Sequence, residues 1–290
     1  MGTAGTQESY NGASPDAIQH HYDVSNEFYR VWLDENRIYS CALWEDGDTL
    51  ESAQLRKLDY FVAQTDAAGS GRVLDIGCGW GGLLQRMSDV HGVESTVGLT
   101  LSEEQADAAR ALGLPGAEVR LENWMDHRPT EKYDAIISIG AFEHFARRGL
   151  SRAERVAGYR AFFESCRSWL RPGGRLGLQT VGKGNVVKLD RAYIRDIAFV
   201  SDDIFPETEP PRLSEILEAS ELIFDPIAVR FDGAHYGRTI RTWLERLQKN
   251  RAAAEAVAGP ETVLKYERYL EVTAQSFEKR FANLFRITFE

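Results

Sequence analysis

A run of glycines directly after a short apolar segment is the feature of this sequence that most clearly predicts ligand binding. Residues 73–82 read Val-Leu-Asp-Ile-Gly-Cys-Gly-Trp-Gly-Gly. The apolar residues predict a buried strand, and the glycines predict a tight turn into a helix, because glycine adopts backbone conformations that other residues avoid. Backbone N–H groups at the start of such a helix bind polar ligands. The pattern therefore predicts a site for a nucleotide-like cofactor.

The residues around this turn distinguish two classes of such cofactor. The glycines satisfy the G-x-G-x-x-G fingerprint of dinucleotide-binding proteins, whose ribose is bound by an acid near the end of the next strand. Here Glu94 stands at the start of the next apolar run, and residues 100–102 (Thr-Leu-Ser) follow its end. Asp75 closes the first strand, and this D-x-G-x-G-x-G form is typical of the cradle for S-adenosylmethionine (SAM). We therefore predict SAM rather than NAD.

An acid and a histidine follow a second apolar run. Residues 133–139 predict a strand buried on both faces, and Glu143 and His144 come shortly after its end. A carboxylate at the carboxyl edge of a sheet is placed to contact a substrate, and a neighbouring histidine is a natural partner in proton removal. The sequence leaves two alternatives open, namely that Glu143 caps a helix and that His144 is a hydrogen-bonded structural histidine.

Alternating strands and helices would position these residues. The apolar periodicity predicts strands at 72–76, 95–99, 117–121, 133–139, 175–180 and 284–289, and helices at 82–90, 102–112 and 152–170. Residues 172–174 (Pro-Gly-Gly) predict a turn before the strand at 175. Such alternation predicts an α/β fold, a mostly parallel sheet with helices on both faces, whose ligands bind at the carboxyl ends of the strands.

Three segments lie outside this alternation. Residues 1–14 are small and polar, and we expect them to form a disordered tail. Residues 15–66 predict a helical amino-terminal lid, and about residues 183–222 predict an inserted helical cap. We expect residues 67–290, including this cap, to form a single SAM-binding catalytic domain.

Composition and charge exclude several classes of protein. The chain has 290 residues and a formal net charge of −10 at pH 7, whereas nucleic-acid-binding proteins carry a basic face. No apolar run approaches the roughly 18 residues of a membrane span, and no signal peptide is evident, so we expect a cytoplasmic protein. Three cysteines predict neither a disulfide framework nor a zinc site, and we expect no metal. One basic cluster is either a solvated surface or a landing site for an acidic carrier: Arg147, Arg148, Arg152 and Arg155.

Four stretches together resemble the cyclopropane-fatty-acid synthase family, especially the short mycolic-acid cyclopropane synthases. They are residues 21–29 (HYDVSNEFY), 39–42 (YSCA), 98–105 (GLTLSEEQ) and 138–145 (SIGAFEHF), and the resemblance extends over about residues 15–290. It implies the class I SAM-methyltransferase fold, a Rossmann-like sheet of seven strands whose last strand is antiparallel. It also implies a stand-alone enzyme that acts on carrier-bound lipids or small natural products.

By position, the resemblance assigns SAM contacts to several stretches of this chain. They contain Tyr39, Ser40, Asp75, Gly77, Cys78, Gly79, Gly81, Thr100, Leu101, Gln105, Trp124, Met125 and Ile139. Side-chain chemistry agrees for two of them, because the Gln105 amide suits the ribose hydroxyls and the Trp124 ring suits the adenine face. A place for Trp124 in the ordinary core is the alternative.

The resemblance also implies a reaction. Family enzymes transfer the methyl group of SAM to an electron-rich alkene carbon, which creates a carbocation, and then remove a proton to leave a cyclopropane or a methyl branch. A bicarbonate ion held near a cysteine, a glutamate, a histidine and a tyrosine serves as the base. Cys41, Glu143 and Tyr236 match this set, but Gln179 stands where the family has the histidine. Glutamine cannot accept a proton at neutral pH, so this departure weakens the prediction of bicarbonate and of ring closure.

We therefore predict a SAM-dependent methyltransferase that acts on an alkene of a lipid or small natural product, free or presented by a carrier protein. Two alternatives remain open. One is an amine N-methyltransferase that uses Glu143 and His144 to orient and deprotonate its substrate, as a related branch of plant enzymes does. The other is a cyclase that keeps SAM as a structural group and uses Cys41 as its nucleophile. The sequence does not predict the oligomeric state.

Overall fold

The computed structural model describes residues 12–14, 25–185 and 191–290. The rest of the predicted tail (1–11), the first part of the predicted lid (15–24) and a short part of the predicted cap (186–190) lie outside the described residues. Residues 12–14 pack on the fold. Ala13 is fully buried, and its backbone N–H donates to the carbonyl oxygen of His144 (2.8 Å).

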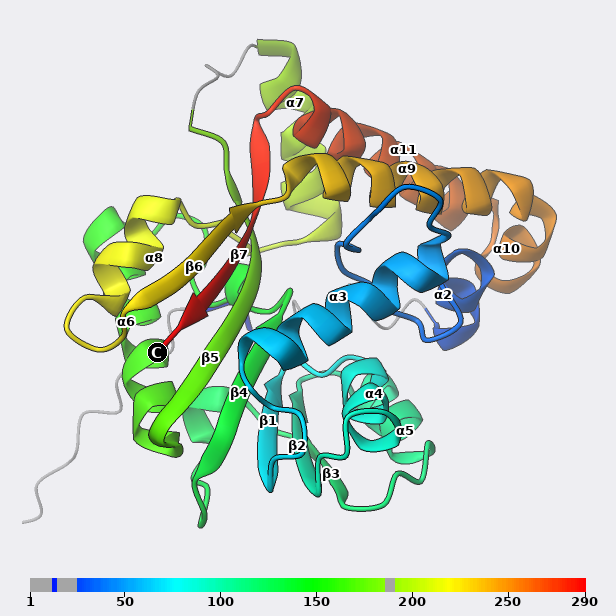
Figure 1. Cartoon of the computed structure of the whole chain (residues 1–290). Coiled ribbons are helices and arrows are strands. Elements are labelled where there is room, and N and C mark those ends of the chain that lie inside the picture. The colour runs from blue at the N-terminus through cyan, green and yellow to red at the C-terminus, as the bar shows by residue number, and fades with distance from the viewer. Residues whose placement is uncertain (1–11, 15–24, 186–190) are drawn as a thin grey trace, which may run out of the picture.

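Seven strands form one sheet in the order β3-β2-β1-β4-β5-β7-β6 (Figure 1). Neighbours from β3 to β5 are parallel, whereas β7 is antiparallel to both β5 and β6. This arrangement confirms the predicted fold class. The strands are β1 (Arg72–Ile76), β2 (Ser95–Thr100), β3 (Ala117–Leu121), β4 (Tyr133–Ile139), β5 (Leu170–Lys183), β6 (Pro226–Phe231) and β7 (Ala282–Phe289).

Helices cover both faces of the sheet and the carboxyl ends of its strands (Figure 1). The α-helices are α2 (Asn26–Trp32), α3 (Leu50–Gln64), α4 (Gly82–Asp89), α5 (Glu103–Arg110), α6 (Arg152–Trp169), α7 (Arg191–Phe199), α8 (Leu213–Ser220), α9 (Gly233–Lys249), α10 (Arg251–Ala258) and α11 (Pro260–Glu278). Short helical turns follow β3 (Trp124–Asp126), β4 (Phe142–His144) and α7 (Val200–Ile204).

Alternate residues of the central strands pack on different helices. Val73 and Ala135 are fully buried in one apolar cluster with side chains of α3 and α4, whereas Leu74 and Ile136 are fully buried in another with side chains of α6 and α8. Successive side chains of a strand point to opposite faces, so a strand covered on both sides must be apolar throughout. This is why the runs at 72–76 and 133–139 read as buried strands in the sequence.

The predicted turn at residues 172–174 lies inside a longer strand. β5 begins at Leu170, which pairs with Tyr133, and the register then shifts so that Arg175 pairs with Ala135. The Pro-Gly-Gly sequence forms an irregularity in the strand, and Gly173 has a φ of +77° there. The prediction of a turn before the strand was therefore wrong, because β5 continues through this irregularity.

Much of the cover above the carboxyl ends of the strands comes from helices that the sequence analysis did not include in the cap. Between β6 and β7, α9, α10 and α11 pack with α2 around Trp32, Trp243 and Tyr266. Within the predicted cap, α7 and the turn at 200–204 contact α11, but α8 packs on α6. In the predicted lid, α3 packs on the face of the sheet.

Two kinds of feature are absent from residues 12–14, 25–185 and 191–290. None of the helices in this part of the chain combines the length and the apolar character needed to cross a bilayer. The same residues contain no group of three or more acidic, histidine or cysteine side chains placed to hold a metal ion.

The turn after β1 depends on a close approach that only glycine allows. Gly77 has a φ of +87°, and a Cβ at this position would lie 2.6 Å from the Cβ of Ala141, in the loop that precedes Glu143. Gly47 has nearly the same φ (+84°), but a Cβ there would meet nothing within 4 Å. Gly47→Ala should therefore lower the free energy of unfolding by about 1 kcal/mol, which is the strain of left-handed backbone alone.

Gly77→Ala adds a steric clash to the same strain. We expect it to lower the free energy of unfolding by about 3 kcal/mol or more, because a packed backbone and a neighbouring Cβ have to separate. Urea-induced unfolding followed by circular dichroism measures both variants. Equal losses for Gly77→Ala and Gly47→Ala would contradict this account of the turn.

Candidate active site

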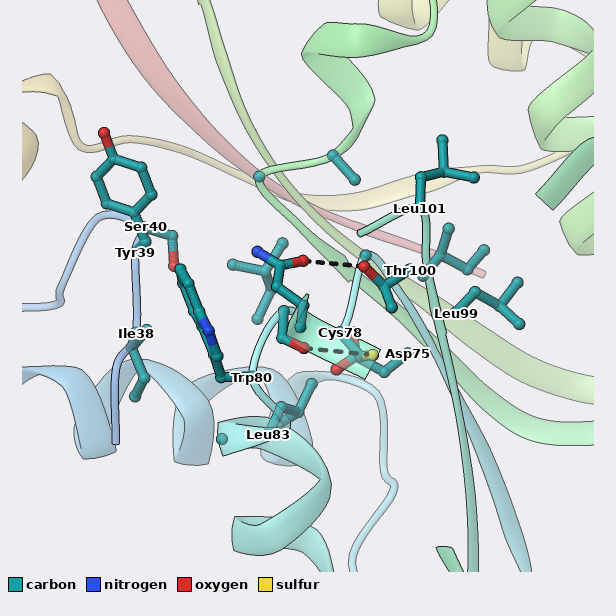
Figure 2. A pocket seen from close by; sticks show the side chains of 18 of the residues that line it. Ile38, Tyr39, Ser40, Asp75, Cys78, Trp80, Leu83, Leu99, Thr100 and Leu101 are labelled. Carbon is teal, nitrogen blue, oxygen red and sulfur yellow. Dashed lines mark hydrogen bonds between the residues drawn. The ribbon is translucent and has the colours of Figure 1, made fainter. Parts of the chain in front are cut away.

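A cavity opens at the carboxyl ends of β1, β2 and β4 (Figure 2). Residues 38–40 form one side of it, and residues from the ends of β1 and β2 form the other. We call it the cofactor cavity, because every predicted SAM contact except Gly81 and Met125 lines it: Tyr39, Ser40, Asp75, Gly77, Cys78, Gly79, Thr100, Leu101, Gln105, Trp124 and Ile139.

The two exceptions have other places in the fold. Gly81 is the residue before α4, with a φ of +87°, and a Cβ there would lie 3.1 Å from the Cβ of Ala109 and 3.0 Å from Leu112 Cδ1. Its glycine therefore allows the start of α4 to pack against the end of α5. Met125 lies in the turn after β3 and packs partly buried against the cluster under α6.

Polar groups in the wall of this cavity fit a polar cofactor. The Thr100 hydroxyl donates to Gln105 Oε1 (2.9 Å), a bond that Figure 2 marks with a dashed line. The NH₂ group of Gln105 has no hydrogen-bond partner among the described residues. Trp124 Nε1 is buried and also has no hydrogen-bond partner among them. Buried donors of this kind are normally bonded, so both are available to a ligand. The SAM contacts predicted for these two residues suit this chemistry.

Trp124 belongs both to the buried core and to the wall of the cofactor cavity. It is only 6% exposed and packs edge-on against Phe162 of α6, with ring centroids 5.4 Å apart. It also lines the cofactor cavity. The indole is therefore part of the core on one side and part of the cavity wall on the other.

A second cavity, of about 570 Å³, lies beneath the cap helices. We call it the cap cavity. It meets the cofactor cavity at four residues that line both: Tyr39, Ser40, Gly140 and His144. Its wall is rich in aromatic side chains from α7, α9, α11 and the segments that follow α7 and α11, namely Tyr193, Phe205, Tyr236, Tyr269, Phe277 and Phe281. The arrangement gives two ligands separate compartments with a short common boundary.

Glu143 stands in the wall of the cap cavity beside this boundary. It belongs to the helical turn after β4, is 9% exposed, and its Oε2 accepts a hydrogen bond from the Thr180 hydroxyl (2.9 Å). Burial raises the pKa of Glu143 to about 7 because desolvation disfavours the charged carboxylate, and the bond from Thr180 partly opposes this rise. A carboxyl group with such a pKa can accept a proton near neutral pH.

His144 does not form a hydrogen bond with Glu143. Its Nδ1 is bonded to Thr208 Oγ1 (2.8 Å), and burial lowers the pKa of His144 to about 4, so the ring is neutral at pH 7. The neighbouring residues therefore do not act as a hydrogen-bonded pair, although both line the cap cavity.

Gln179 is bonded to a buried arginine that the sequence analysis did not identify. Arg286 Nε donates to Gln179 Oε1 (2.8 Å), and its guanidinium also forms an ion pair with Asp232 and donates to the carbonyl oxygens of Cys41 and Ala42 (3.1 and 3.0 Å). Arg286 is fully buried and lines neither cavity. Gln179 itself lines the cap cavity, as does Tyr236.

Cys41 does not contribute to the wall of either ligand compartment. It is fully buried, lines neither cavity, and its thiol donates to the carbonyl oxygen of Ala42 (3.2 Å). Burial raises the pKa of the Cys41 thiol to about 11. A protonated thiol of this kind is a poor nucleophile, so the geometry favours a space-filling role for Cys41 in the core.

Lys57 is a second buried cation that the sequence analysis did not identify. It is 1% exposed, lines the cofactor cavity, and donates from Nζ to Ser40 Oγ (2.8 Å). The sequence did contain a signal, because Lys57 occupies the apolar face of α3 at helical spacing from Leu50, Ala53 and Phe61. Arg286 likewise stands within the otherwise apolar and threonine-containing strand β7.

Carboxylates pair with three arginines of the predicted basic cluster. Arg148 pairs with Asp202, Arg152 with Glu218 (2.5 Å) and Arg155 with Glu215 (2.5 Å). These pairs reduce the positive charge that an acidic carrier would meet, which favours the interpretation of the cluster as an ordinary solvated surface.

The fold and the cofactor cavity together define a class of enzyme. A mostly parallel sheet of seven strands with an antiparallel β7, and a glycine turn that opens a cavity at its carboxyl edge, are the features of the class I SAM-dependent methyltransferases. The sequence model of the mycolic acid cyclopropane synthetase family matches residues 11–287. The chain belongs to this family, and its cofactor is SAM.

Similar proteins cover nearly the whole chain. Cyclopropane mycolic acid synthase 3 of Mycobacterium tuberculosis is 33% identical, over 94% of this chain and 96% of its own length. The S-adenosylmethionine-dependent methyltransferase UmaA of the same species is 34% identical, over 92% and 94%. A crystal structure of the mycolic acid cyclopropane synthase CmaA1, complexed with SAH and CTAB, has a TM-score of 0.87 and 30% identity, and covers 96% of this chain and 98% of its own.

The hydrogen bond from Thr180 lowers the pKa of Glu143, against the rise that burial causes. The hydroxyl stabilises the charged carboxylate, so its loss in Thr180→Val should raise the pKa of Glu143 from about 7 by roughly one pH unit, the worth of a hydrogen bond to a charged group. A ¹³C-glutamate NMR titration measures this shift directly. Thr65→Val is the matched control, because Thr65 is also buried but donates to the carbonyl oxygen of Phe61. A pKa of Glu143 that is unchanged or lower in Thr180→Val would contradict the assignment.

Proposed function

We propose that this enzyme transfers a methyl group to an alkene carbon of a lipid chain that lies in the cap cavity. The observation that carries this proposal is a buried carboxyl group, Glu143, with a pKa of about 7, in an aromatic cavity next to the cofactor cavity. Relatives named as cyclopropane mycolic acid synthases support a lipid acceptor. An alkene carbon can attack the methyl group of SAM without the help of a base. The carbocation that this attack creates, however, needs a base to accept its proton.

The residues of the cap cavity suit this chemistry. SAM, when bound, supplies an electrophilic methyl group. The aromatic rings of Tyr39, Phe205 and Tyr269 line the cavity where positive charge develops on the acceptor, and aromatic faces stabilise cations where water is excluded. Glu143 then accepts the proton that the methylated carbon skeleton loses. Proton loss from a neighbouring carbon leaves a methyl branch with an alkene, and proton loss from the new methyl group closes a cyclopropane.

Bicarbonate does not fit the groups around Glu143 in the cap cavity. We propose that Glu143 accepts the proton directly, without a bound bicarbonate ion. The anion would stand beside the Glu143 carboxylate. The nearby guanidinium of Arg286 directs its N–H groups to protein atoms, among them Gln179 and Asp232, and does not reach the cavity. Gln179 cannot accept a proton, and Cys41 lies outside the cavity.

The two alternative functions have less support. An N-methyltransferase that uses Glu143 and His144 together would need the histidine as a partner, but its ring is bonded to Thr208. A cyclase that uses Cys41 as nucleophile would need the thiol at a cavity wall, where it does not lie. Mass spectrometry with methyl-labelled SAM separates the three functions, since only the first adds the label to carbon.

Replacement of Glu143 tests the base directly. Glu143→Gln keeps the shape and hydrogen bonding of the side chain but cannot accept the proton, so kcat with an unsaturated acyl substrate should fall about 100-fold or more. The dissociation constant of SAM, measured by calorimetry, should stay unchanged because Glu143 does not line the cofactor cavity. Glu164→Gln, on the exposed face of α6, is the control. Full turnover by Glu143→Gln would refute the assigned role.

Omission of bicarbonate tests the second part of the proposal. In buffer freed of carbon dioxide, kcat should equal that in the same buffer with added bicarbonate, because Glu143 accepts the proton itself. Sodium chloride at equal ionic strength controls for charge screening. A saturable rise of kcat with bicarbonate would show that the ion is required after all.

A further inference from the structure

The wall of the cofactor cavity contains a buried cation whose hydrogen-bonding capacity is mostly unused. Lys57 Nζ donates to Ser40 Oγ (2.8 Å), and this is its one hydrogen bond within the described residues. An ammonium group has three N–H donors. Burial lowers the pKa of Lys57 to about 7, and the positive charge of Arg286 adds to this effect. The donors of a buried ammonium group are normally hydrogen-bonded. The unused donors of Lys57 are therefore available to a ligand that enters the cofactor cavity.

An equally unpaired anion lies near it. Asp75, at the end of β1, is 2% exposed and lines the same cavity, and its carboxylate accepts no hydrogen bond and forms no ion pair within the described part of the chain. Burial raises the pKa of Asp75 to about 7, and the charge of Lys57 lowers it. The two side chains interact through their charges but form no ion pair with each other.

The other acidic group near Lys57 is already occupied. Asp34 accepts from the backbone N–H groups of Ile38 and Asn36 (2.9 and 3.0 Å), so it holds the start of segment 38–44. Asp34 therefore does not replace the missing partner of Lys57. What remains is one cation and one anion on the wall of the same cavity. This pattern complements a zwitterion, and the amino-acid end of SAM carries an α-carboxylate and an α-ammonium group.

We propose that Lys57 is a further cofactor-binding residue, which recognises the α-carboxylate of SAM. The two neighbours that the family resemblance already assigns to SAM then complete the contact, the Ser40 hydroxyl at the carboxylate and Asp75 at the α-ammonium group. Ser40 lines both cavities, so this pair of ionic contacts lies next to the boundary where methyl transfer has to occur. A short methylene chain joins the amino-acid end to sulfur, so contacts at Lys57 position the sulfonium as well. The proposal concerns the cofactor alone and does not depend on the identity of the methyl acceptor.

Arg37 is the competing cation, because it also lines the cofactor cavity and its Nη1 is buried without a partner. Two observations favour Lys57. The Lys57 side chain is almost fully buried, whereas Arg37 is partly exposed and lies near the charges of Glu27 and Arg30. Lys57 is also bonded directly to Ser40 at the boundary between the cavities. The Arg37→Met variant therefore belongs in the test.

Calorimetric binding measurements with three ligands, in the absence of a methyl acceptor, distinguish recognition of the SAM carboxylate by Lys57 from a purely structural role of Lys57. SAM has both charged groups, decarboxylated SAM lacks the carboxylate, and 5′-methylthioadenosine lacks the whole amino-acid end. Lys57→Met should weaken binding of SAM by roughly 10- to 100-fold, the worth of a hydrogen-bonded ionic contact, and leave the other two ligands unchanged. Asp75→Asn should weaken SAM and decarboxylated SAM alike and leave 5′-methylthioadenosine unchanged. Lys57→Arg should retain part of the preference for SAM.

The outcomes that overturn the proposal are distinct. If Lys57→Met weakens all three ligands equally, Lys57 only supports Ser40 and the fold of the cavity. If Arg37→Met, and not Lys57→Met, removes the preference for SAM over decarboxylated SAM, the carboxylate contact belongs to Arg37. Lys132→Met, at an exposed position before β4, is the control for loss of a positive charge. This test measures binding of SAM and its analogues and not turnover of a methyl acceptor. Its outcome is therefore independent of the proposed function.

Discussion

Tyr39 and Ser40 of an extended segment, residues 38–44, line both cavities, and the site depends on the buried side chains that bind the backbone of this segment. Gln54 donates to two of its carbonyl oxygens (3.1 and 2.9 Å), and Arg286 donates to two more (3.1 and 3.0 Å), those of Cys41 and Ala42. The segment belongs to no helix or strand, so its buried polar groups need side-chain partners. The shared wall of the two cavities is thus positioned by α3 and β7, which are far apart in the chain.

The guanidinium group of Arg286 also connects this segment to Gln179 in the wall of the cap cavity. The register of β5 and β7 pairs Gln179 with Arg286, and the two side chains are hydrogen-bonded at 2.8 Å. Arg286 is also paired with Asp232, and removal of one partner of a buried ion pair costs about 3–5 kcal/mol. The glutamine is therefore matched to its surroundings, because its carbonyl oxygen accepts from a group that can only donate. The departure from the family histidine is part of a complete network.

Local signals in the sequence were sufficient for most of the fold and for the glycine turn of the cofactor cavity, whereas the other predicted residues of this cavity came from the family resemblance. The strands at 72–76, 117–121 and 133–139 have the predicted bounds, because apolar runs and glycine turns act over a few residues. Lys57 and Arg286 were not identified, since their partners lie on other elements and depend on packing and on strand register. For the same reason, sequence position alone did not show that Gly81 serves helix packing or that Cys41 lies away from both cavities.

The pairing of Gln179 with Arg286 also constrains how this lineage can diverge. A change at either position alone leaves a buried polar group unpaired, which costs about 1–3 kcal/mol. Neutral drift therefore cannot pass easily through the single intermediates, and the two positions are expected to be epistatic. A different pair at these positions would therefore require replacement of both residues together, one on β5 and one on β7.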